Sequence, residues 1–365
     1  MDSLDKSTDS AVRHGRAAPM RLFCNICALT LFIATLVSAH ADTDGQQLAQ
    51  DAGRPLLGTS APRLILKTID GETIDLGRLY GRQAVYLKFW ATWCVPCREQ
   101  MPHFERAYET AGPDFAVVAI NIGFNDTLED VRDYQRKVHI TMPIVIDDGR
   151  LAAAFHLRVT PQHVVIGRDG RILYLGHLAD ARLDAALQAA RSGAASAAAA
   201  AGATPADIRM VRLGVGDSLP QESRRTLNGN PFALYDPQDP RPTVLRFLSP
   251  WCESYLATTR PAVAADCRRM RQQVAALKHD PGVRVRWLGV ASGLWATAQD
   301  LKDYQREFHM SIPLTLDESG QDFRAFEVTQ VPTALVVDVH GRILRKVVGE
   351  QFGVSSALRA AVSNL

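Results

Sequence analysis

The sequence has no excess of charge of either sign. Its 365 residues carry 41 basic and 39 acidic side chains, which gives a formal net charge of +2. This balance excludes the strongly basic surface that is typical of nucleic-acid-binding proteins and of proteins that bind anionic membranes. No Met-rich or His-rich cluster accompanies the cysteines, which argues against a copper site. We therefore expect no cofactor, no metal and no nucleic-acid partner.

Cysteine is scarce, with six residues in the whole chain. The cysteines lie in three places, as the pairs Cys24 and Cys27, Cys94 and Cys97, and Cys252 and Cys267. A zinc site of the CxxC…CxxC kind is not expected, because only one CxxC falls in the part that should fold. The length and the 47% hydrophobic content instead predict two domains, each able to bury a sizeable core.

An apolar run near the N-terminus follows several basic residues. Arg13, Arg16 and Arg21 precede the apolar segment 22–39, and Ala39-His40-Ala41 has small residues where a signal peptidase cleaves. We predict that residues 1–41 are a signal peptide. The alternative is an uncleaved anchor, since the run is near the lower length for a membrane span. Both place the rest of the chain in the periplasm, with membrane contact only if the segment is uncleaved.

The remainder of the chain repeats one plan. Residues 85–94 and 244–252 are both apolar strands that end in Trp-Cys, with a basic residue, Lys88 or Arg246, six positions before the cysteine. An Asp-Tyr-Gln-Arg block, a proline before an apolar stretch, and Gly-Arg-Ile-Leu then recur in the same order. This shared order predicts an internal duplication. The longer spacing in the second copy predicts an insertion around residues 264–282.

The repeat sets the predicted domain organisation. We predict folded domains at residues 55–191 (the first copy) and 207–365 (the second copy), joined by an Ala/Gly-rich linker at 192–206. Apolar runs typical of buried strands alternate with polar helical stretches, which predicts βαβ units around a central sheet. In the first copy the expected strands are residues 63–69, 84–91, 115–122, 143–147, 163–168 and 172–178, and the expected helices are residues 95–110, 128–139 and 179–191.

The motif Cys94-Val95-Pro96-Cys97 carries the expected chemistry. It ends a buried strand and opens a helix, whose free N–H groups and dipole stabilise a thiolate. Cys97 returns within one turn, so Cys94 would attack a disulfide and the deeper Cys97 would resolve the mixed disulfide. Trp93 would flank and shield the exposed sulfur. The alternative is a CxxC that is only a structural staple, in a non-catalytic periplasmic binding or chaperone-like module.

Pro161 and Lys88 are the other candidate residues of the catalytic site in the first copy. Pro161 follows Thr160 just before an apolar strand, so it is either a cis-proline beside the CxxC or an ordinary loop proline. Lys88 either reaches the thiols and favours the Cys94 thiolate, or extends from the strand end to water.

The stretch 89–102, together with Pro161, resembles the TlpA/ResA-type thioredoxin-like disulfide reductases, a redoxin family, and the resemblance covers roughly Gly58–Arg191. It implies two tandem thioredoxin-like α/β domains, each a central mixed sheet flanked by helices. It also implies an exported enzyme that reduces protein disulfides, in some members for cytochrome c or oxidase maturation, and that is recharged by a membrane thiol donor. It assigns Cys94 as attacking thiol, Cys97 as resolving thiol and Pro161 as the cis-proline.

The second copy lacks the CxxC. Tyr255 stands where the resolving cysteine is expected. Cys267 follows Cys252 by 15 positions, which is about 22 Å along a straight helix and too far for a disulfide. The two can bond only if Pro261 breaks the helix and the chain folds back.

Three interpretations of the second copy are open. It is a degenerate domain kept for partner binding or packing, or a second redox centre that exchanges electrons with Cys94 and Cys97, or a peroxide-reactive thiol. Pro332 keeps the proline position, and Arg246 keeps a cation near Cys252, which favours some retained reactivity.

Overall fold

The computed structural model describes residues 44–193 and 211–349. The predicted signal peptide or anchor and most of the predicted linker lie outside these residues. The described residues from Gly45 onward belong to one compact unit. Within the described ranges, no helix has the length and apolarity needed to span a membrane.

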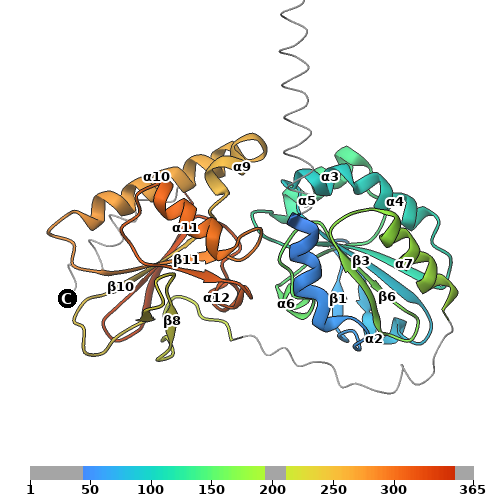
Figure 1. The fold of residues 1–365 in the computed structure, drawn as a ribbon, viewed down its shortest axis with the longest axis horizontal. Helices are drawn as coiled ribbons and strands as arrows, with labels where there is room; N and C mark the ends of the chain where they lie inside the picture. Colours follow the sequence, from blue (N-terminus) through green and yellow to red (C-terminus); the bar gives the residue numbers. More distant parts are fainter. Residues whose placement is uncertain (1–43, 194–210, 350–365) are drawn as a thin grey trace, which may run out of the picture. The chain divides into compact units, whose positions relative to one another are not determined.

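The first copy is built on a five-stranded sheet with the order β5-β4-β3-β6-β7 (Figure 1). Strand β3 pairs in parallel with β4, which pairs in parallel with β5, whereas β6 is antiparallel to both β3 and β7. The sheet is therefore mixed, as expected. Its strands are β3 (Ala84–Trp90), β4 (Phe115–Asn121), β5 (Ile144–Ile146), β6 (Gln162–Ile166) and β7 (Ile172–Gly176).

The central strand β3 explains why the sheet forms at this place in the chain. All seven of its residues are buried, which fits the continuous apolar run of a strand covered on both faces. Tyr86 and Trp90 pack on one face with Phe104, while Leu87 and Phe89 pack on the other. The elements that accompany the sheet are β1 (Ile65–Lys67), β2 (Thr73–Asp75), α2 (Leu76–Leu79), α5 (Leu128–Val138), α6 (Arg150–Ala154) and α7 (Ala181–Ser192).

The predicted single helix over residues 95–110 is wrong. The structure has two helices, α3 (Val95–Glu99) and α4 (Met101–Glu109), separated at Gln100. Pro102 explains the break, because proline lacks the N–H that would continue the helix and its ring clashes with the carbonyl four residues earlier. The CxxC therefore heads a helix of little more than one turn.

The second copy has the same topology, with the sheet order β12-β11-β10-β13-β14. Both sheets are mixed and flanked by helices, so the predicted α/β fold class is confirmed. The strands are β8 (Ser223–Arg225), β9 (Pro231–Ala233), β10 (Thr243–Leu248), β11 (Arg286–Ser292), β12 (Leu314–Asp317), β13 (Thr333–Val337) and β14 (Ile343–Val348). The helices are α9 (Cys252–Thr259), α10 (Pro261–Lys278), α11 (Ala298–Glu307) and α12 (Gln321–Ala325).

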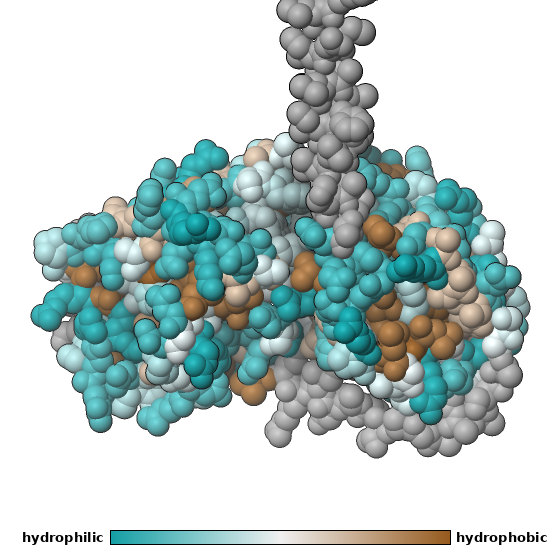
Figure 2. All heavy atoms as spheres, viewed as in Figure 1, coloured by the Kyte–Doolittle hydropathy of each residue, from teal (hydrophilic) through white to brown (hydrophobic). Residues whose placement is uncertain are grey.

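Helix α10 has 18 residues where α4 has nine, at the place of the predicted insertion. The face shown in Figure 2 is mostly hydrophilic, with small separate apolar patches. Large exposed apolar side chains are scattered among the described residues, and include Leu57, Ile65, Leu173 and Val215.

Candidate active site

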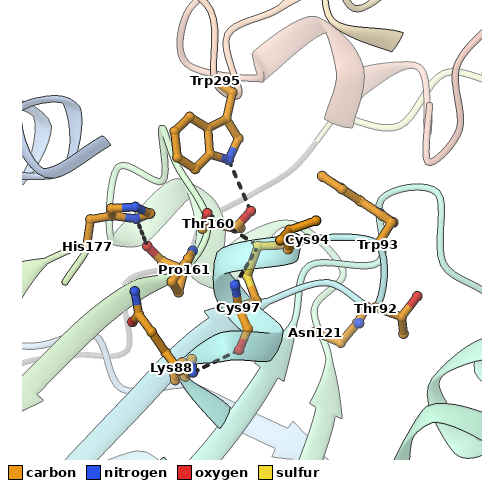
Figure 3. The surroundings of a disulfide bond; sticks show 12 residues. Lys88, Thr92, Trp93, Cys94, Cys97, Asn121, Thr160, Pro161, His177 and Trp295 are labelled. Carbon is orange, nitrogen blue, oxygen red and sulfur yellow. Dashed lines mark hydrogen bonds between the residues drawn. A yellow bond between two sulfur atoms is a disulfide. The ribbon is translucent and has the colours of Figure 1, made fainter. Parts of the chain in front are cut away.

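Cys94 and Cys97 form a disulfide at the point where β3 gives way to α3 (Figure 3). Cys94 is the N-cap of α3, and its Sγ accepts a hydrogen bond from the Cys97 backbone N–H at 3.2 Å. A sulfur in this position faces the positive end of the helix, where a thiolate is stabilised once the disulfide is reduced. Pro96 lies in the first turn, where its missing N–H removes no helical hydrogen bond.

The loop before β6 lies against the attacking sulfur. The Thr160–Pro161 peptide bond is cis, and the Thr160 carbonyl oxygen is 3.4 Å from Cys94 Sγ. His177 Nδ1 donates a hydrogen bond to the Pro161 carbonyl at 2.7 Å (Figure 3). Pro161 is therefore beside the CxxC and is not an ordinary loop proline.

Lys88 lies beneath the CxxC helix. Its side chain is fully buried, and its Nζ donates to the Cys97 carbonyl at 3.3 Å and lies 5.3 Å from the centre of the Phe104 ring. The interpretation that Lys88 reaches water is wrong, because the strand is covered by α3 and α4 on this face. Burial lowers the pKa of Lys88 to about 7, so both its neutral and its charged forms are present near neutral pH.

A buried polar chain beside Lys88 was missed by the sequence analysis. His163 pairs with Lys88 across β3 and β6. The hydroxyl of Tyr86 lies 2.7 Å from His163 Nδ1, and Gln100 Oε1 lies 2.8 Å from His163 Nε2. Burial, and then the charge of Lys88, hold the pKa of His163 well below its ordinary value. No sequence signal could identify this histidine, since its placement depends on strand register.

Trp93 was expected to flank and shield an exposed sulfur. This prediction is wrong in part, because the sulfur of Cys94 is itself buried. Cys94 is 1% exposed and Trp93 is 2% exposed. The Trp93 indole N–H donates to the Phe124 carbonyl at 2.7 Å, which fixes the ring beside the disulfide. The preceding Thr92 donates from its backbone N–H and its hydroxyl to the buried carboxylate of Asp126.

The second copy contains its own disulfide, between Cys252 and Cys267. The straight helix considered for this stretch is not formed. Helix α9 ends at Thr259 and α10 begins at Pro261, with Arg260 between them in a non-helical conformation. The chain folds back at this break, which brings the two cysteines within bonding distance.

The other predicted residues of the second copy are also buried. Arg246 is 1% exposed, with its guanidinium 3.5 Å from the Tyr304 hydroxyl. The Nε and Nη1 atoms of Arg246 have no hydrogen-bond partner within the described ranges. The Val331–Pro332 bond is cis, as at the matching position of the first copy.

Removing the second disulfide should destabilise the chain without removing the CxxC. A bond that closes a loop of this length, 15 residues, is worth about 3 kcal/mol through its effect on the unfolded chain. We expect Cys252→Ala/Cys267→Ala to lower the free energy of unfolding in urea by that amount, and the Cys94–Cys97 pair to keep its redox titration. An unchanged unfolding midpoint would mean that the bond contributes nothing to stability.

The first copy is similar to proteins of a known family. Residues 57–175 match the AhpC/TSA family. Thioredoxin-like protein YneN of Bacillus subtilis is 35% identical over 116 residues, covering 32% of this chain and 68% of YneN. Thiol-disulfide oxidoreductase ResA of Bacillus subtilis is 27% identical over 150 residues, covering 40% of this chain and 76% of ResA.

Among solved structures, a thiol:disulfide interchange protein of Chlorobium tepidum has 28% sequence identity and covers 36% of this chain and 96% of its own, with a TM-score of 0.33. The similarity to YneN covers enough of that relative to establish the family. The Cys94–Cys97 disulfide at a helix N-terminus fits the thiol–disulfide chemistry that the name of ResA describes. The chain therefore belongs to the AhpC/TSA redoxin family of thioredoxin-like proteins and is a thiol–disulfide oxidoreductase.

Proposed function

We propose that the protein is an exported enzyme that reduces disulfides in other proteins through Cys94 and Cys97. The observation that supports this most directly is the position of Cys94 as N-cap of α3, with the Cys97 N–H directed at its sulfur. Reduction of a substrate needs a stabilised thiolate and a second thiol within reach, and this geometry offers both.

The reaction would proceed in two exchanges. The Cys94 thiolate attacks one sulfur of the substrate disulfide, and the other substrate sulfur leaves as a thiolate that takes up a proton. Cys97, deprotonated, then attacks Cys94, which releases the second substrate thiolate and forms the Cys94–Cys97 disulfide. Two electrons pass to the substrate, and an external thiol donor must return two electrons before the next cycle.

The N-terminal segment and the resemblance to a known family support the location, the electron donor and the substrates of the enzyme. The basic and apolar residues before Ala41 support export to the periplasm, with anchoring to the inner membrane if they are not removed. The resemblance to TlpA/ResA-type proteins supports a membrane thiol donor, and substrates among the proteins of cytochrome c or oxidase assembly. For the second copy we propose a degenerate domain that serves packing or partner binding, because Tyr255 replaces its resolving cysteine.

A redox titration tests the direction of the reaction. The mature protein would be equilibrated in glutathione or dithiothreitol buffers, and each cysteine alkylated and identified by mass spectrometry. We expect Cys94 and Cys97 to titrate together at about −270 mV, the potential of thioredoxin.

The titration has two contrary outcomes. A value of about −120 mV would indicate an enzyme that forms disulfides. Resistance to reduction throughout would show a structural CxxC and would contradict the proposed function. A separate transition at Cys252 and Cys267 would identify a second redox centre.

A further inference from the structure

The redox disulfide is covered by the second copy. Trp251, the counterpart of Trp93, stacks on the Trp93 ring with centroids 5.2 Å apart and an interplanar angle of 30°. Trp295 donates from its indole N–H to the Thr160 hydroxyl at 3.2 Å, as Figure 3 shows beside the disulfide. Cys94 is 1% exposed in this arrangement.

Each copy donates an equivalent backbone hydrogen bond to the other. The Asn125 N–H donates to the Thr329 carbonyl at 2.7 Å, and the Trp295 N–H donates to the Arg158 carbonyl at 2.8 Å. Asn125 and Trp295 hold matching positions after β4 and β11, and Arg158 and Thr329 hold matching positions before the two cis-prolines. The two copies thus meet through the same surface, the one that surrounds each Trp-Cys motif.

The backbone at this interface has an unusual conformation in both copies. Asn125 has φ 54° and Trp295 has φ 55°, in the left-handed region that Asn adopts readily but that a side chain as bulky as Trp rarely adopts. A residue keeps such a conformation only where the surrounding contacts require it, and this happens most often at functional sites. For Trp295, those contacts are its hydrogen bonds to Arg158 and Thr160 of the first copy.

Tyr255 makes a contact that the resolving cysteine of an intact CxxC could not make. Its hydroxyl accepts a hydrogen bond from the Val95 N–H at 2.9 Å. Val95 is the first residue of α3, and the free N–H groups there are those that stabilise an anion next to Cys94. The substitution that removes the redox pair from the second copy therefore provides a contact to the redox pair of the first.

Arg260 adds a polar contact at the edge of this surface. Its guanidinium donates to Asp126 Oδ1 at 2.8 Å, to Asp130 Oδ1 at 2.7 Å and to the Thr92 hydroxyl oxygen at 2.7 Å. Asp126 also accepts hydrogen bonds from Thr92 and Asn121 within the first copy. Its buried carboxylate thus keeps partners if Arg260 is removed, so an Arg260 variant should fold.

We propose that the second copy occupies the substrate-binding face of the first, and that a protein disulfide reaches Cys94 only after the second copy is displaced. Disulfide exchange requires that the attacking sulfur be accessible to the sulfur that it attacks. A folded protein substrate cannot approach a sulfur that is 1% exposed while Trp251, Tyr255 and Trp295 contact its neighbours Trp93, Val95 and Thr160. This inference rests on the proposed function only for the nature of the substrate.

Alkylation of Cys94 by reagents of two sizes tests the proposal in the full chain. Mildly reduced protein would be treated with iodoacetamide or with a polyethylene-glycol maleimide, and Cys94 modification followed by mass spectrometry. Molecules in which Cys252–Cys267 stays oxidised would be scored separately. In Arg260→Ala we expect Cys94 to react with the large maleimide about tenfold faster than in the wild type, since loss of charge-assisted hydrogen bonds favours the open state. Iodoacetamide should show a smaller difference.

The matched control is Arg241→Ala. Arg241 pairs with Asp239 inside the second copy, so its removal should leave the rate unchanged. Tyr255→Phe removes a single hydroxyl and should give an intermediate increase, which keeps the test decisive if Arg260→Ala does not fold.

Equal maleimide rates in the wild type, Arg260→Ala and Tyr255→Phe, all folded by circular dichroism, would overturn the proposal. The measurement uses no substrate, so it can fail while the redox titration supports a reductase. It can equally succeed if that titration shows an oxidant.

Discussion

Cys94→Ser should reduce the rate of disulfide reduction by about 10³-fold or more, because a serine hydroxyl is not ionised near neutral pH and cannot form the mixed disulfide. The measurement is the dithiothreitol-driven reduction of insulin, followed by turbidity. Cys252→Ser is the matched control, since Cys252 holds the corresponding place in the second copy. Loss of activity in the control alone would move the redox centre to the second copy.

Cys97→Ser should stop the same reaction one step later. The Cys94 thiolate can still attack, but the resolving thiol is missing, so the mixed disulfide accumulates. A non-reducing gel should show adducts of the chain with substrate proteins that dithiothreitol releases. The same adducts in a Cys94→Ser/Cys97→Ser variant would show that the bond forms through another cysteine.

Lys88→Met should stabilise the fold near neutral pH, and the gain should shrink as the pH rises. The pKa of Lys88 is about 7 in the folded chain and about 10.4 in an unfolded one. Between these values the unfolded chain binds more protons, so the free energy of unfolding of the wild type rises with pH. Each pKa unit corresponds to about 1.4 kcal/mol. The free energy of unfolding of Lys88→Met should therefore exceed that of the wild type by about 4 kcal/mol at pH 7, and this difference should disappear towards pH 10.

Urea unfolding of the wild type and Lys88→Met at several pH values measures this difference. Comparing the two chains at each pH removes the contribution of groups that Lys88 does not influence. His163 faces Lys88 from β6 and its pKa is lowered well below the ordinary value by burial and then by the charge of Lys88, so the comparison is made at pH 7 and above, where this histidine is neutral in the wild type. A constant difference across this range would show that Lys88 titrates normally. Lys88→Ala tests the second expectation, that loss of the cation raises the pKa of the Cys94 thiol, and an unchanged thiolate titration would contradict it.

The sequence alone predicted the sheet and the redox pair for physical reasons. β3 is buried on both faces, so its run of apolar residues is continuous and ends visibly at Trp93-Cys94. Because this order of features recurs, the second sheet could be predicted from the first.

Other features depend on contacts between distant segments and carry no local signal. His163 lies beside Lys88 only because β6 pairs with β3 in one register. The cover over Cys94 requires Trp251 and Trp295, which lie more than a hundred residues further along the chain. The sequence indicated a possible helix break at Pro261 but gave no role to Arg260, whose guanidinium donates a hydrogen bond to Asp126 of the first copy.

The bonding of the cysteines also determines what a count of free thiols would report. All four cysteines of the described residues are in disulfides, Cys94 with Cys97 and Cys252 with Cys267. A colorimetric thiol assay on denatured, never-reduced protein in this state therefore registers none of them. Any thiol that it detects belongs to Cys24 or Cys27, both of which precede the predicted cleavage site at Ala41. In protein whose Cys94–Cys97 and Cys252–Cys267 pairs are both oxidised, a positive count would thus identify chains that still carry their N-terminal segment.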